Sequence, residues 1–177
     1  MNACIPLAVA ENADAAPPAW SFVLNGQAVE VHCAPDQRLL SLLREHFLLV
    51  GAKPGCEVGR CGACMVWLDG QPANSCLLMA WQLEGRQVTT IESLSCTPQA
   101  APVVAALAQS GGVQCGYCSA GMCMGLTYLH QQPGMDAPTA SALMCGHLCR
   151  CTGYGGIQRA IDALFPAPDQ RNSAGIS

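Results

Sequence analysis

Charged residues are scarce in this sequence of 177 residues. They make up 11% of the composition, whereas apolar residues make up 51%, and only eight residues are lysine or arginine. With a net charge of −4, the chain lacks the basic surface that nucleic-acid binding requires. So little charge also predicts that part of the surface is covered by a partner protein.

Long apolar runs and a basic leader are missing as well. No stretch approaches the roughly 20 apolar residues of a transmembrane helix. The first basic residue is Arg38, so the start has neither the basic region of a secretory signal nor a twin arginine. We also find no phosphate-binding loop and no nucleophile triad. We therefore expect a cytoplasmic protein without a membrane span and without a catalytic site of its own.

The first half of the chain predicts a small sheet packed on one helix. Asn25-Gly26 is a strong hairpin signal because both residues tolerate positive φ. Asp36 is a candidate cap for a helix with apolar residues on one face. A loop rich in glycine and cysteine follows at 51–64. The expected strands are Trp20–Leu24, Ala28–Cys33, Cys64–Leu68 and Gln87–Ile91.

The second half predicts helices, because β-branched runs disappear and prolines separate the apolar stretches. We expect a flexible extension at 1–18, a sheet domain at 19–96, a four-helix domain at 97–166 and a tail at 167–177. The expected helices are Ala101–Gln109, Ala120–Gln131, Thr139–Gly146 and Gly156–Phe165.

Thirteen cysteines are the most informative feature of the sequence, and eight of them form two compact sets. The first set has the spacing C-x4-C-x2-C-x11-C, whose first three positions match the plant-type [2Fe–2S] pattern. The second set has the spacing C-x2-C-x30-C-x-C. The first set is Cys56, Cys61, Cys64 and Cys76, and the second is Cys115, Cys118, Cys149 and Cys151.

Three kinds of site use cysteine in this way: disulfides, zinc sites and iron–sulfur clusters. A disulfide framework is disfavoured by the odd number of cysteines and by apolar segments sufficient for a core. Structural zinc sites typically pair two C-x2-C knuckles, whereas the first set begins C-x4-C. Four glycines at 51–62 also suit a loop that turns its N–H groups towards an anionic cluster. Two [2Fe–2S] clusters are the preferred interpretation.

The stretch from Gly55 to Cys64, followed by Cys76, resembles the plant-type ferredoxin domain of the xanthine oxidase, or molybdenum hydroxylase, family. A free plant-type ferredoxin also has this motif, but it has no second half like that of this chain. Gln114-Cys-Gly-Tyr-Cys118 and Leu148-Cys-Arg-Cys-Thr-Gly-Tyr154 resemble the helical [2Fe–2S] domain of the same family. The resemblance spans about residues 20–166.

The resemblance implies an α+β chain in which a β-grasp ferredoxin domain precedes a four-helix [2Fe–2S] domain. It implies an electron-transfer subunit that works beside a large molybdopterin-binding subunit. Gln114 and Cys151 would contact the pterin. Electrons would pass from the molybdenum centre through the second cluster and then the first, to an FAD-binding subunit or another acceptor such as a cytochrome. The alternatives are a stand-alone ferredoxin-like carrier and a zinc-stabilised interaction module.

The sequence departs from the family pattern at two places. Ser119-Ala120 stands where the family often has Thr-Pro, and Gly146-His147 where it often has Gly-Asn. Because four cysteines already complete the second set, we predict that His147 is a surface or interface residue and no ligand. The five remaining cysteines are expected to pack as small apolar residues. These are Cys4, Cys33, Cys96, Cys123 and Cys145.

Overall fold

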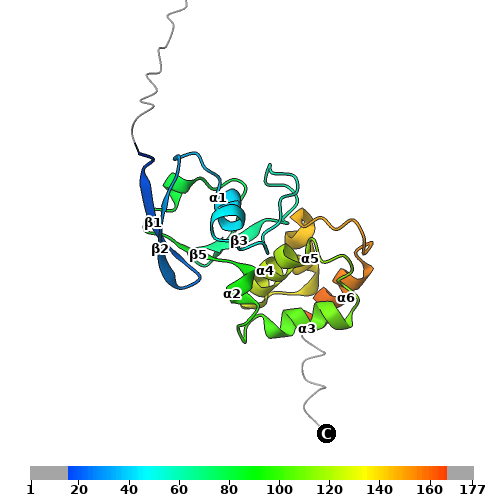
Figure 1. Cartoon of the computed structure of the whole chain (residues 1–177). Helices are drawn as coiled ribbons and strands as arrows, with labels where there is room; N and C mark the ends of the chain where they lie inside the picture. The colour runs from blue at the N-terminus through cyan, green and yellow to red at the C-terminus, as the bar shows by residue number, and fades with distance from the viewer. Residues whose placement is uncertain (1–15, 167–177) are drawn as a thin grey trace, which may run out of the picture.

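The structure, a computed structural model, describes residues 16–166. The predicted tail at 167–177 and most of the predicted extension at 1–18 lie outside the described residues. The described chain forms a sheet lobe followed by a helical lobe (Figure 1). Among the helices at 16–166, none has both the length and the apolar character that crossing a membrane requires.

The sheet lobe is a mixed five-stranded sheet in the order β2-β1-β5-β3-β4. β1 pairs in parallel with β5, and the other pairs are antiparallel. The predicted hairpin is confirmed: Asn25 and Gly26 have φ angles of 53° and 82° between β1 and β2. The strands are β1 Ala19–Leu24, β2 Gln27–His32, β3 Met65–Leu68, β4 Gln71–Asn74 and β5 Gln87–Thr89.

Two details of this lobe differ from the predictions. β4 was not expected, because its sequence Gln-Pro-Ala-Asn has weak β propensity. It forms a strand because it pairs with β3 at the sheet edge, where proline is tolerated. Asp36 does not cap the helix, because the helix begins after Arg38 and has no side-chain cap.

One helical segment covers the sheet and completes the core of this lobe. It starts as α1 (Leu39–Ser41) and continues as the π-helical turn η1 (Leu42–His46). Its Leu39 and Leu43 are fully buried in one apolar cluster with Val66 and Val88 of the sheet. Burying each leucine stabilises the fold by about 1.5–3 kcal/mol. This packing gives the cysteine loop that follows a rigid base.

The helical lobe is built around α4, which is buried along most of its length. α4 packs on α2 and α3 of the helical lobe and on β3 and β4 of the sheet lobe. The indole Nε1 of Trp67 in β3 donates a hydrogen bond to the carbonyl of Met124 in α4 at 3.2 Å. The helices are α2 Ile91–Leu94, α3 Ala101–Gln109, α4 Ser119–His130, α5 Ala137–Leu143 and α6 Gly155–Leu164.

The described helical core extends beyond the four predicted helices. Leu94 of the short helix α2 packs in the same apolar cluster as α3, α4 and α6. Asp136 caps α5, because its Oδ1 accepts a hydrogen bond from the N–H of Thr139 at 2.9 Å. α4 contacts helices and strands alike, so it joins the sheet lobe to the helical lobe. The description of the helical lobe as a four-helix domain stays a prediction.

Candidate metal centres

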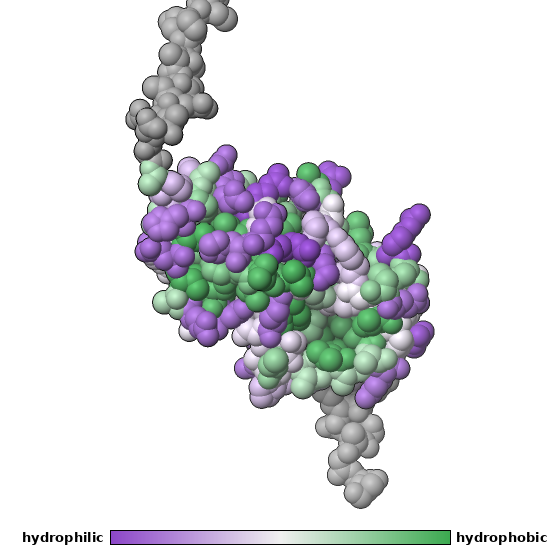
Figure 2. Space-filling view, viewed as in Figure 1, coloured by the Kyte–Doolittle hydropathy of each residue, from purple (hydrophilic) through white to green (hydrophobic). Residues whose placement is uncertain are grey.

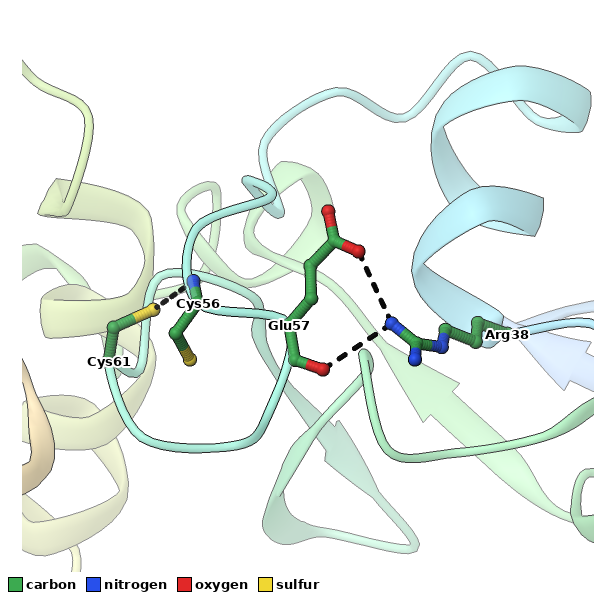
Figure 3. Close-up of polar contacts among 4 residues, drawn as sticks. All are labelled: Arg38, Cys56, Glu57 and Cys61. Atoms are coloured by element: carbon green, nitrogen blue, oxygen red, sulfur yellow. Dashed lines mark hydrogen bonds and ion pairs between the residues drawn. The ribbon is translucent and has the colours of Figure 1, made fainter.

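The first cysteine set lies in the loop between η1 and β3 and just after β4. The N–H of Cys56 donates to Sγ of Cys61 at 3.4 Å, and the N–H of Arg60 donates to Sγ of Cys56 at 3.1 Å. Figure 3 shows how Arg38 holds this loop: Nη1 lies 3.2 Å from the carboxylate of Glu57 and 3.4 Å from its carbonyl. The loop therefore turns backbone N–H groups towards sulfur, as an anionic metal site requires.

The four thiols of the first set occupy two contrasting environments. Hydrogen bonds from the backbone of Val58 and then of Arg60 lower the pKa of Cys56 to about 7. Cys64 and Cys76 are 3% and 1% exposed and their side chains interact. Burial raises the pKa of Cys64 to about 11. The buried thiol therefore needs a bound cation to lose its proton, whereas Cys56 ionises readily.

Glycine is required where this loop wraps the sulfurs. A Cβ atom on Gly55 would lie 2.8 Å from Sγ of Cys61. Gly62, between two cysteines, has a φ of +69°, a conformation that side chains disfavour. The glycines singled out in the sequence thus have a steric reason in the structure.

The second set is assembled from the start of α4 and the turn before α6. Sγ of Cys151 lies 3.5 Å from Sγ of Cys115 and 3.8 Å from Sγ of Cys149. Thr152 Oγ1 donates to Sγ of Cys149 at 2.9 Å, and the hydroxyl of Tyr154 accepts the N–H of Cys149 at 2.9 Å. These contacts turn the C-x-C segment so that its cysteines meet the pair that lies 30 residues earlier.

The second set also combines one thiol of lowered pKa, Cys149, with one of raised pKa, Cys118. Burial alone would raise the pKa of Cys149, but hydrogen bonds from Thr152 bring it down to about 7. Burial, followed by the interaction with Cys149, raises the pKa of Cys118 to about 12. Cys115 and Cys151 are exposed, so this site opens to the surface on one side.

The thiols of both sets gather mainly as pairs. Within residues 16–166, no group of three or more histidine, cysteine or acidic side chains surrounds a position for a single ion. A [2Fe–2S] cluster binds its four thiolates two to each iron, so paired thiols fit its chemistry. The pairs are Cys56 with Cys61, Cys64 with Cys76, Cys115 with Cys151, and Cys118 with Cys149.

The two sites are neighbours. A cavity of about 330 Å³ is lined by cysteines of both sets, together with Arg150. The N–H of Leu148 donates to the carbonyl of Cys61 at 3.0 Å, and the hydroxyl of Tyr117 donates to the carbonyl of Pro54. Each bond connects a residue next to the second set with the loop of the first set. The arrangement therefore suits electron transfer between the two metal sites.

Exposed apolar side chains surround both sites, and Figure 2 shows apolar surface over both lobes. Gln114 is exposed beside Cys115 and close in sequence to this apolar surface. The second-site rim consists of Val113, Tyr117, Leu148 and Tyr154, which are 41–54% exposed. The first-site rim consists of Val58 and Leu77, which are 62% and 52% exposed; Leu77 packs beside Gly59 of the cysteine loop.

Some single-residue predictions were wrong. His147 is only 6% exposed, so it is not a surface residue. Cys123 is buried, as expected for a small apolar residue, whereas Cys96 and Cys145 are exposed. No signal in the sequence separates these cases, because burial depends on how the lobes pack. Cys4 lies outside the described residues.

Comparisons with known proteins decide the family. The model of the 2Fe-2S iron-sulfur cluster binding domain matches residues 22–101, and the model of the [2Fe-2S] binding domain matches residues 90–162. A probable xanthine dehydrogenase subunit of Bacillus subtilis is 44% identical, over 80% of this chain and 82% of the relative. This chain belongs to the [2Fe–2S] small subunits of the molybdenum hydroxylase family.

Other relatives agree with this assignment. Caffeine dehydrogenase subunit gamma of a Pseudomonas species is 38% identical, over 84% of this chain and 92% of the relative. The crystal structure of quinoline 2-oxidoreductase from Pseudomonas putida superposes with a TM-score of 0.76 at 35% identity, covering 85% of this chain and 94% of that chain. The small subunit is thus a non-catalytic electron-transfer subunit of an oxidoreductase, and its family implies a molybdopterin-binding partner.

Proposed function

We propose that the eight paired cysteines bind two [2Fe–2S] clusters. When bound, each cluster accepts one electron and passes it on. The thiol pairs described above supply two ligands to each iron, and backbone N–H groups stabilise the thiolates. We also propose that residues 19–96 act as a β-grasp ferredoxin domain and residues 97–166 as a four-helix cluster domain.

The pterin of the partner subunit is proposed to lie against Gln114 and Cys151. Both residues are exposed, and Sγ of Cys151 lies 3.5 Å from Sγ of Cys115, the neighbour of Gln114. A glutamine side chain offers two donors and one acceptor to a pterin edge. The second-site rim supplies the apolar area that a permanent subunit interface requires.

Electrons would leave through the first site, towards an FAD-binding subunit or another acceptor. The supporting observation is the first-site rim, where Val58 and Leu77 are more than half exposed in and beside the cluster loop. We propose a cytoplasmic location because thiols that ligate metal are maintained in a reducing compartment.

The experiment is the purification of the complex with this chain as wild type or as Gln114→Ala. The wild type should co-purify with a molybdenum-containing chain and, when reduced, show two distinct [2Fe–2S] EPR signals. A single signal would show that one ligand set is misassigned, and zinc without iron or sulfide would overturn the proposal. Isolation without a molybdenum subunit would favour a stand-alone carrier.

Gln114→Ala should keep both clusters but lose pterin retention and turnover, because no ligand is removed. The matched control is Gln109→Ala, an exposed glutamine at the end of α3. If Gln114→Ala behaves like this control, the proposed pterin contact is wrong.

A further inference from the structure

His147 is the buried polar residue that the proposed function leaves unexplained. It lies two residues before Cys149 and is 6% exposed. Both ring nitrogens are buried without a hydrogen-bond partner among the described residues. Burial lowers the pKa of His147; the backbone carbonyls of Gly121 and Met144 oppose this shift, but neither forms a hydrogen bond with the ring. Since unpaired buried nitrogens are unfavourable, the ring is not retained here for its hydrogen bonds.

The shape of the ring explains its position. A Cβ on Gly62, in the first cysteine loop, would lie 2.7 Å from Cδ2 and 3.0 Å from Cγ of His147. A Cβ on Gly125, in α4, would lie 3.0 Å from Cε1 and from Nε2. The imidazole is therefore wedged between two glycine backbones, one from each lobe.

His147 lies next to the hydrogen bond that connects the two sites directly. The residue after His147 is Leu148, whose N–H donates to the carbonyl of Cys61 at 3.0 Å. From Sγ of Cys149, the backbone leads to this N–H, across one hydrogen bond, and on to Sγ of Cys61. Any change in the spacing between the first loop and the turn that carries His147 and Leu148 alters this route.

We propose that His147 is a positioning residue for electron transfer between the two iron–sulfur sites. Its ring is a spacer that holds the Cys61 loop and the Cys149 turn at a set separation. This inference rests on the proposed assignment of both cysteine sets as cluster ligands.

Two substitutions separate the contacts of the ring atom by atom. His147→Asn keeps Cγ and the two planar atoms bonded to it, and so keeps the closest contacts with Gly62, but it loses the ring atoms Cε1 and Nε2 that face Gly125. His147→Ala loses both contacts. The matched control is His32→Ala, a histidine of β2 whose side chain is 61% exposed.

The experiment uses the purified complex with both clusters reduced. The readouts are iron and sulfide per chain, the EPR splitting caused by magnetic interaction between the clusters, and the rate of electron arrival at the first cluster after substrate addition. His147→Ala should retain both signals but lose the splitting, and the electron should arrive more slowly. His147→Asn should fall between alanine and wild type, and His32→Ala should match wild type.

Splitting and rate unchanged in both His147 variants would overturn the proposal. If the alanine variant loses iron, the asparagine variant decides: reduced splitting supports the spacer role, and wild-type splitting rejects it. A wild-type complex without two [2Fe–2S] signals would instead reject the proposed function.

Discussion

Gly121→Ala is the most direct test of how the helical lobe approaches the first cysteine loop. Gly121 lies in α4, and a Cβ there would run into the carbonyl oxygen of Gly62. It would also lie 3.0 Å from the carbonyl carbon of Gly62 and 3.4 Å from Cα of Ala63. These are backbone atoms between two proposed ligands, so they cannot rotate away as a side chain would.

The magnitude follows from two opposing effects. In a helix interior, replacing glycine by alanine normally stabilises by about 1 kcal/mol. Overpacking costs about 1–3 kcal/mol, and a rigid backbone obstacle favours the upper end. The net effect at Gly121 is a loss of about 2 kcal/mol, which lowers Tm by about 4–8 °C for a chain of this size.

The assay is thermal unfolding of the cluster-loaded chain, followed by circular dichroism. The control is Gly155→Ala at the start of α6, where the nearest atom to a Cβ is Nη1 of Arg159 at 3.7 Å. This control should leave Tm unchanged or raise it. A Tm for Gly121→Ala at or above that of the control would refute the close approach of α4 to Gly62.

Two further predictions concern the thiols. Cys118→Ser should lose one cluster, and so about half of the iron, because four thiolates hold each cluster. Cys123→Ser, five residues further along α4, should keep full iron content by metal analysis; equal losses would reject the assignment. In the metal-free chain, alkylation of Cys56 should reach half its maximal rate near pH 7, since its pKa is lowered to about 7. A lowered pKa stabilises the folded chain above the ordinary thiol pKa, and this contribution is lost as the pH falls through about 7. A midpoint near the ordinary thiol pKa would contradict the hydrogen bonds to its sulfur.

Local signals in the sequence predicted those parts of the fold that depend on neighbouring residues. The Asn25-Gly26 hairpin was correct because its turn depends on two residues that tolerate positive φ. β4 was missed because Gln71–Asn74 becomes a strand only through pairing with β3. The burial of His147 was missed because it depends on Gly62 and Gly125, which lie far from it in the sequence.

The sequence by itself pointed to the chemistry of this protein, because it contains two sets of four cysteines and a glycine-rich loop that can expose N–H groups. Its low content of charged residues also predicted a surface that is partly covered by a partner protein. Short spacings are enough to indicate the chemistry, because ligand geometry within a loop is local. Only the tertiary structure decided that the sites lie side by side, joined by Leu148 and Cys61 and spaced by His147. Such contacts depend on how α4 packs against the sheet lobe, and packing between distant residues leaves no periodic pattern in a single sequence.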